Sequence, residues 1–196
     1  MERKAKINRV TKETDINLEI NLDNNKEESN IDTGIGFFDH MLYSFAKHSF
    51  IHLDLNVKGD LYVDTHHTIE DAGIVLGKGI KQAVGDKKGI RRYGSAIIPM
   101  DDALLLCSLD LSGRPYLVFD VELSKERVGD FETEMLKEFF YAVSYSAGMN
   151  LHIKLIHGEN NHHIIEGIYK AFAKAFDQAI SFDQRIDDVL STKGTI

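Results

Sequence analysis

Two copies of one histidine–glutamate motif are the residues of this sequence best suited to chemistry. The segments His66-His67-Thr68-Ile69-Glu70 and His162-His163-Ile164-Ile165-Glu166 lie 96 residues apart. In an α-helix, residues four apart share a face, so the first histidine and the glutamate of each copy can bind the same metal ion. The second histidine points roughly 100° away from the first. The motifs therefore predict two metal ions, each bound by a His–Glu pair from one helix and by a single histidine from the other.

The ligand types narrow the choice of metal. Imidazole nitrogen together with carboxylate oxygen suits Mn, Fe, Co, Ni or Zn and argues against Ca or Mg alone. A single motif of this kind would be weak evidence, but two identical motifs at matching places in a repeat favour metal binding. The glutamate does not lie between the two histidines, so the pattern is not the HExxH of zinc proteases.

Each motif is preceded by a predicted helix that carries one more candidate ligand. His40 lies 12 residues before His52, and Glu138 lies 14 residues before His152, near the equivalent place in the second copy. Alone, His40 would more often be a packing or surface histidine, but the repeat favours ligation. We interpret the remaining histidines as structural or as outer neighbours of the site: His48, His52, His152 and His157.

The repeat and the period of the apolar residues predict the elements that must hold these side chains. Thr65 is placed to cap the helix that begins at His66. We expect a polar loop over 24–30, strands over 14–22, 51–57, 96–111, 116–122 and 151–156, and helices over 37–47, from 66 onward, over 132–147 and over 162–181. The expected fold is α+β, with a mixed or antiparallel sheet in each half and helices on one face. The halves, 1–90 and 91–196, should pack as one compact unit.

The composition is that of an ordinary globular protein, with 196 residues, 43% apolar and 28% charged. The formal net charge of −8 disfavours a nucleic-acid partner. Cys107 is the only cysteine, which fits a reducing compartment. The charged N-terminus is not followed by an apolar stretch. We therefore expect no signal peptide and no membrane association, and we expect a cytoplasmic location.

Several motifs, in order along nearly the whole chain, resemble the imidazoleglycerol-phosphate dehydratase family. They are Phe38-Asp39-His40-Met41-Leu42, the segment from Asp64 to Asp71, the segment from Asp110 to Tyr116, and Asn161-His162-His163-Ile164-Ile165-Glu166, with Arg9 to Thr14 and Ser191 to Gly194 at the two ends. The resemblance implies two duplicated ferredoxin-like βαβ-type halves, a fold also described as ribosomal protein S5 domain 2-like. It also implies a homo-oligomer of trimers assembled into a 24-mer, with active sites between subunits.

The resemblance also implies two Mn²⁺ ions per active site and a ligand set for each. One ion would take His40, His67, His162 and Glu166, and the other would take His66, Glu70, His163 and the residue at position 138. Many relatives carry histidine where this chain has Glu138, so the second ligand set departs from the common pattern. Ser44 is another departure, because many relatives have glutamine there beside the substrate.

The reaction implied by the resemblance is the dehydration of D-erythro-imidazoleglycerol phosphate to imidazole-acetol phosphate, a step of histidine biosynthesis. Glu13 matches a glutamate of the family's N-terminal motif and is our candidate for proton transfer. Asp101 is a second candidate, and Glu70 and Glu166 could share proton work with ligation. The phosphate would be bound by Arg92, Arg114, Lys170, Ser191, Thr192 and Lys193.

Two other functions compete with this interpretation. A different di-metal enzyme, such as a hydrolase with metal-activated water, could use the same ligands. A non-catalytic metal-binding or shell-forming storage protein could also carry them. The basic residues and Glu13 favour the enzyme, because storage alone does not require them.

Overall fold

The computed structural model describes residues 3–24 and 26–194. The predicted charged start at residues 1 and 2, and position 25 of the predicted 24–30 loop, lie outside the described residues. Within the described ranges, no helix is both long and apolar enough to cross a membrane.

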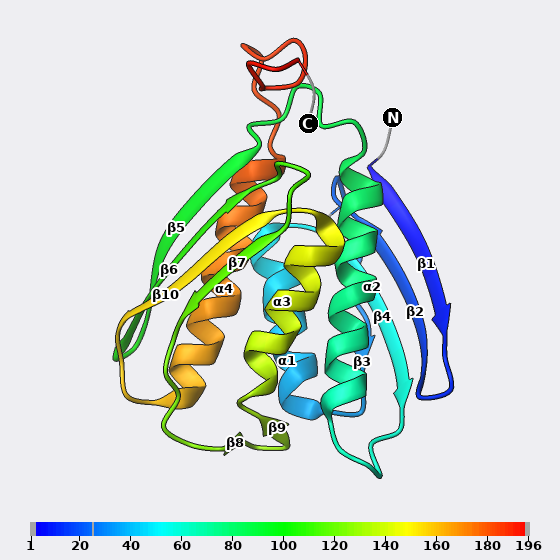
Figure 1. Ribbon diagram of the computed structural model, residues 1–196, viewed down its shortest axis with the longest axis vertical. Coiled ribbons are helices and arrows are strands. Elements are labelled where there is room, and N and C mark those ends of the chain that lie inside the picture. The colour runs from blue at the N-terminus through cyan, green and yellow to red at the C-terminus, as the bar shows by residue number, and fades with distance from the viewer. Residues whose placement is uncertain (1–2, 25, 195–196) are drawn as a thin grey trace.

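Two four-stranded sheets face each other across four helices (Figure 1). The first sheet has the order β1-β2-β4-β3 and the second the order β5-β6-β10-β7. The strands of the first are β1 (Lys4–Val10), β2 (Thr14–Asn21), β4 (His52–Gly59) and β3 (Ile31–Asp32). Those of the second are β5 (Tyr93–Met100), β6 (Ala103–Asp110), β10 (Asn150–His157) and β7 (Tyr116–Asp120). A short hairpin, β8 (Arg127–Val128) and β9 (Phe131–Glu132), precedes the third helix.

The two halves have the same topology. In each sheet the first three neighbouring strands pair antiparallel, and the last strand pairs parallel to its neighbour. Each half then contributes two helices, α1 (Gly36–Ser49) and α2 (His66–Val84) or α3 (Met135–Ala147) and α4 (Asn161–Ile180). The prediction of a duplicated α+β fold with helices on one face of each sheet is confirmed.

The helices fill the space between the sheets. The first sheet is covered by α1 and α2, and the second by α3 and α4, while α2 packs on α3 and α1 on α4 (Figure 1). Phe45 of α1 stacks on Phe172 of α4 with ring centroids 4.9 Å apart. Cys107 on β6 is fully buried in this core, and burial raises the pKa of its thiol. The predicted division at 90/91 lies in the linker between α2 and β5. This linker pairs with the C-terminal segment through β-bridges between Lys88 and Val189 and between Ile90 and Phe182.

Several local predictions were wrong for identifiable reasons. The predicted 96–111 strand is two strands, because Asp101 adopts φ 48° in a turn that contains no glycine. The strand β1 was missed because Arg9 takes an inward position in its alternation. The third helix begins three residues after the predicted 132, since Glu132 belongs to β9. Thr65 does not cap α2; its hydroxyl donates to Glu132 at 2.7 Å instead.

Two glycines allow α2 and α3 to approach closely. A Cβ placed on Gly77 would lie 2.6 Å from Ser146 Cβ and 2.7 Å from the Val143 carbonyl oxygen. A Cβ on Gly73 would lie 2.8 Å from the Phe139 carbonyl oxygen. Both glycines lie inside a helix, where glycine costs roughly 1 kcal/mol relative to alanine. The close approach of the two helices explains why glycine is used here.

Gly77→Ala should therefore destabilise the protein, although alanine favours the helix. We expect a loss of about 1 to 3 kcal/mol, because backbone atoms of α3 must move. Urea unfolding of the variant measures this loss. Lys78→Ala, at the exposed next position, is the control and should stay within about 0.5 kcal/mol of the parent protein. Equal unfolding midpoints for the two variants would contradict the contact.

Candidate active site

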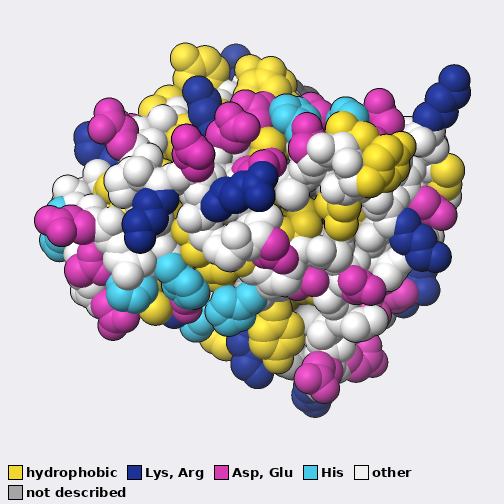
Figure 2. Space-filling model, turned by 90° about the horizontal axis from the view of Figure 1, so that it is seen from below, with side chains coloured by type: hydrophobic (Ala, Val, Ile, Leu, Met, Phe, Trp, Pro, Cys, Tyr) yellow, Lys and Arg dark blue, Asp and Glu magenta, His cyan; other side chains and the backbone are white. Residues whose placement is uncertain are grey.

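The two histidine motifs begin their helices at the same end of the molecule. Histidine side chains gather on this end in the space-filling view (Figure 2). The Asn160 side chain caps α4 by accepting from the backbone N–H groups of His162 and His163. At the start of α2, Asp64 accepts from the N–H of His66 at 2.8 Å. The first turns that carry the motifs are thus held by side-chain acceptors.

Within each motif, the first histidine faces the glutamate. His66 Nε2 lies 3.7 Å from Glu70 Oε2, and His162 Nε2 lies 3.3 Å from Glu166 Oε2. The rings of neighbouring histidines are close to perpendicular, at 74° in the first motif and 79° in the second. Each helix therefore presents one His–Glu pair in one direction and one further histidine in another.

The second histidine of each motif is bracketed by two carboxylates. His67 Nδ1 lies 3.0 Å from Asp60 Oδ2, and its Nε2 lies 3.8 Å from Glu13 Oε1. His163 Nδ1 lies 2.6 Å from Asp102 Oδ1, and its Nε2 lies 3.3 Å from Asp101 Oδ2. A carboxylate that accepts the Nδ1 proton leaves the Nε2 lone pair free for a metal ion or a proton.

The same carboxylates shift the ionisation of the site. The Asp60 hydrogen bond raises the pKa of His67. Backbone N–H of Glu159, the His163 ring and backbone N–H of Asn160 all hold the pKa of Asp102 far below its usual range. Asp102 therefore stays ionised as the acceptor for His163.

Glu13 and Asp101 occupy equivalent places. Glu13 lies in the turn between β1 and β2, and Asp101 in the turn between β5 and β6. Each turn is the first hairpin of its half, and each aims a carboxylate at Nε2 of the second motif histidine. The structure thus brings both predicted proton-transfer candidates to the histidine end.

His40 and Glu138 are equivalent as well. Each lies ten residues before the left-handed residue that ends its helix, Phe50 for α1 and Gly148 for α3. His40 lies on the helix that packs against α4, and the ring of nearby Phe37 meets the His162 ring edge-on at 5.1 Å. Glu138 lies on the helix that packs against α2.

Glu166 has a cationic neighbour that Glu70 does not share. Burial opposes ionisation of Glu166, but Lys170 and, more weakly, His40 and His162 hold its pKa below the usual value. Lys170 Nζ lies 2.7 Å from Glu166 Oε1. Four residues after Glu70, the chain has Ile74 instead of a lysine. Across residues 3–24 and 26–194, no three His, Cys, Asp or Glu side chains converge closely enough to hold a metal ion.

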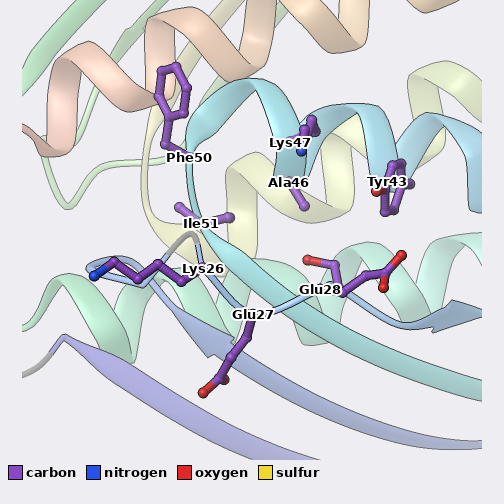
Figure 3. Close-up of a pocket in the computed structure, with 9 residues that line it drawn as sticks. Lys26, Glu27, Glu28, Tyr43, Ala46, Lys47, Phe50 and Ile51 are labelled. Carbon is purple, nitrogen blue, oxygen red and sulfur yellow. The ribbon is translucent and has the colours of Figure 1, made fainter.

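The predicted phosphate ligands lie mostly at the other end of the molecule. A cavity of about 800 Å³ there is lined by five of the six: Arg92, Arg114, Ser191, Thr192 and Lys193. The sixth, Lys170, lies instead beside Glu166 and Met100. A separate hollow of about 430 Å³, between the 26–29 loop and the end of α1, contains none of the predicted site residues (Figure 3).

Arg92 mainly holds the C-terminal segment in place. Its guanidinium donates to both carboxylate oxygens of Asp110, at 2.6 and 3.0 Å, and to the Leu190 carbonyl at 2.7 Å. Arg92 is only 8% exposed. Arg114 is freer, since its Nη1 donates a long 3.5 Å bond to the Ser112 carbonyl of its own turn. Arg114 and Lys193 are therefore better placed than Arg92 to bind an anion directly.

The two ends are far apart within one chain. The histidine motif lies at the start of α4, from His162. At the other end of the same helix, the Ala179 carbonyl accepts from the N–H of Arg92, a residue that lines the basic cavity. A helix of 20 residues is about 30 Å long. The histidine end and the basic cavity of a single chain are separated by about that distance.

Sequence reasoning missed several residues of this arrangement. Asp60, Asp102 and Asp110 bind His67, His163 and Arg92, and Asp71 binds Arg9. Asp71 ends one of the family-like motifs of the sequence and Asp110 begins another, and those places were the available signals. Asp60 and Asp102 come from turns, whose positions relative to a helix are not encoded in any sequence period.

The sequence and the fold both match those of known proteins. The family model for imidazoleglycerol-phosphate dehydratase (IGPD) matches residues 33–176. The imidazoleglycerol-phosphate dehydratase of Lachnoclostridium phytofermentans is 63% identical over 196 residues, covering 100% of both chains. That of Acetivibrio thermocellus is 59% identical, again over 100% of both. The crystal structure of the imidazoleglycerol-phosphate dehydratase from Staphylococcus aureus superposes with a TM-score of 0.84, and its sequence is 43% identical. The match covers 92% of this chain and 99% of that one.

These matches, together with the duplicated fold, define a hydro-lyase, an enzyme that eliminates water from its substrate. The chain belongs to the imidazoleglycerol-phosphate dehydratase family, whose activity implies a role in histidine biosynthesis. Membership removes the two rival interpretations, an unrelated metallohydrolase and a storage protein.

Replacing Arg92 should release the C-terminal segment. Arg92→Gln leaves the largely buried Asp110 without its partner, which should cost about 2 to 4 kcal/mol. Limited trypsin digestion should then cut faster after Arg185 and Lys193. Arg127→Gln, which removes an exposed ion pair with Glu132 far from this segment, is the matched control. Cleavage at the parental rate in the Arg92 variant would show that the segment is held by other contacts.

Proposed function

We propose that this dehydratase converts D-erythro-imidazoleglycerol phosphate to imidazole-acetol phosphate at a site that holds two Mn²⁺ ions. The single observation that carries the proposal is the pair of equivalent histidine–carboxylate clusters at one end of the molecule. Their donors are imidazole nitrogens and carboxylate oxygens, the set that Mn²⁺ and its neighbours in the transition series accept. When bound, the ions supply Lewis-acid and template chemistry to the imidazole ring.

The proposed ligands fall into two sets, each built mainly from two packed helices. His40 of α1 joins His162 and Glu166 of α4, and Glu138 of α3 joins His66 and Glu70 of α2. His67 completes the first set and His163 the second, both from another copy of the chain. Glu138 gives the second set a second carboxylate, and Ile74 leaves Glu70 without the lysine that Glu166 has. A more oxygen-rich, more negative set favours Mn²⁺ over softer ions.

The chain's own residues carry out the proton transfers. Glu13 accepts the proton from the second carbon away from the ring, and the hydroxyl on the ring-bonded carbon takes up one proton and leaves as water. The enol that forms then tautomerises to the ketone, so no net proton is consumed. Glu13 lies beside Nε2 of His67, which is a proposed metal ligand, and this position supports the role. A base must lie close to the substrate, whose imidazole ring is bound at the metal ions. Asp101 has the equivalent position beside His163 and is the second candidate. Glu70 and Glu166 act chiefly as ligands.

The phosphate is bound by the basic cavity of another copy. A five-membered ring joined to a three-carbon phosphate cannot span the roughly 30 Å between the two ends of one chain. The site is therefore composite, with the ring at the histidine end of one copy and the phosphate at Arg114, Ser191, Thr192 and Lys193 of a neighbour. Lys170, beside Glu166, lies nearer the ring than the phosphate in this arrangement. Symmetric assembly of trimers into a 24-mer would repeat this contact around the particle. A cytoplasmic location belongs to the same proposal.

Removing the metal should abolish turnover, and restoring it should recover turnover. Protein stripped with a chelator is expected to lose dehydration of imidazoleglycerol phosphate in step with its Mn content, measured by elemental analysis. Added Mn²⁺ should restore both together. Protein exposed to a chelator already saturated with Mn²⁺ is the control. Full turnover in stripped protein would refute the proposed metal site.

Mixing two inactive variants tests the composite site. His162→Asn removes a ligand at one end, and Arg114→Gln removes a phosphate contact at the other. Each variant alone should be nearly inactive. Particles dissociated together and co-assembled should regain activity, because some sites then combine an intact histidine end with an intact basic cavity. If each site lies within one chain, co-assembly will restore no activity. The control is each variant dissociated and reassembled separately, which gives the baseline activity.

A further inference from the structure

A buried ionic network ties the Glu13 turn to the helix that carries the first motif. Arg9 of β1 and Thr14 of β2 both donate to the same carboxylate oxygen of Asp71 on α2. Asp71 is 6% exposed and Thr14 is 3% exposed. Asp71 directly follows Glu70 in the motif. The network therefore joins both strands of the hairpin to the helix turn that faces the proposed metal site.

From this network, hydrogen bonds continue to the backbone of Glu13. The Thr14 and Thr11 hydroxyls lie 3.2 Å apart. Thr11 Oγ1 accepts from the N–H groups of Glu13 and Thr14, at 3.1 and 3.0 Å. The Thr11 N–H donates to the Thr14 carbonyl at 2.8 Å. The Glu13 side chain itself is 53% exposed, so its direction is determined by the turn rather than by packing.

The second half joins its hairpin to its helix differently. Asp102, in the turn of this hairpin, accepts from the N–H groups of Glu159 and Asn160 and lies 2.6 Å from His163 Nδ1, all at the start of α4. Gly167 follows Glu166 as Asp71 follows Glu70. A Cβ on Gly167 would lie 2.3 Å from Leu105 Cδ2 and 3.4 Å from Met100 Cβ, so the Asp101 hairpin rests on α4 by apolar contact. At the place equivalent to Asp71, the strands of the second hairpin thus meet their helix by close packing. A buried ion pair is often replaceable by packing at no loss of stability, so its presence points to a need for directional bonds.

We propose that Asp71 is a positioning residue for Glu13, acting through Thr14 and Thr11 on the turn that aims this carboxylate at the substrate. Arg9 neutralises Asp71 and completes its hydrogen bonding. The inference rests on the proposed function, in which Glu13 transfers the proton.

Steady-state kinetics of the Mn-loaded, assembled enzyme test the inference. Asp71→Asn and Thr14→Val are expected to lower kcat about 10- to 100-fold, the effect of a small misplacement of a catalytic group. KM, Mn content and particle size should stay close to those of the parent. Thr14→Ser keeps the hydroxyl and should retain most of the parental kcat. This split between kcat and KM, with rescue by serine, is not expected of a purely structural network.

The same hairpin offers a matched control. At its open end, Arg3 donates to Asp23 through Nε and Nη2, at 3.0 and 2.6 Å, and this pair also joins the two strands. Asp23→Asn should lower the unfolding midpoint about as much as Asp71→Asn does and leave kcat unchanged. Parental kcat in both Asp71→Asn and Thr14→Val would overturn the positioning role. Glu13→Gln separates the two proposals: a fall of about 10²- to 10⁴-fold supports Glu13 as the base, and parental activity refutes that role instead.

Discussion

Adjacent residues of a helix cannot face the same ion, and the arrangement of this protein follows from that constraint. In both motifs the neighbouring histidine rings are turned nearly perpendicular, so each helix divides its imidazoles between two directions. In the proposed ligand sets, the His–Glu pair of each helix is joined by a side chain from the helix packed beside it, α1 for α4 and α3 for α2. The other histidine is turned toward two carboxylates. His67 meets Glu13 of the first hairpin and Asp60, which follows β4, and His163 meets Asp101 and Asp102 of the second hairpin. Helices, sheets and turns are thus all needed to orient eight side chains at one end of the molecule.

The length of the helices sets a second condition. Although the chain is acidic, four cationic side chains line the cavity at the far end, and Arg92 and Arg114 lie there near the C-terminal segment. The proposed substrate carries a ring that suits the histidine end and an anion that suits the basic end. Its small size and the length of α4 together require copies of the chain to face one another. Assembly, in the proposed function, is therefore a condition for catalysis rather than an addition to a finished site.

Much of the fold could be predicted from the sequence, because period and repetition are local signals. The four main helices and most long strands lie close to the expected ranges, and the equivalence of His40 and Glu138 emerged from the repeat before the helix ends showed it. The turn at Asp101 could not be predicted, since its positive φ occurs at a residue that gives no glycine signal. Asp60 and Asp102 could not be predicted either, and the only signal for Asp71 was its place beside Glu70 at the end of its motif. Their roles depend on which turn meets which helix, and that is decided by tertiary packing.

The duplication also has a consequence for how the site can change over evolutionary time. In a symmetric pair of separate half-size chains, every substitution would appear twice, once in each equivalent position. Joining the halves in one chain removes this restriction. The chain can hold histidine at position 40 and glutamate at 138, a lysine after one motif and an isoleucine after the other, and Asp71 where the second half has Gly167. The two histidine clusters can then come to differ in charge, and the two hairpins can come to differ in how they are joined to their helices. Both halves keep the same backbone fold.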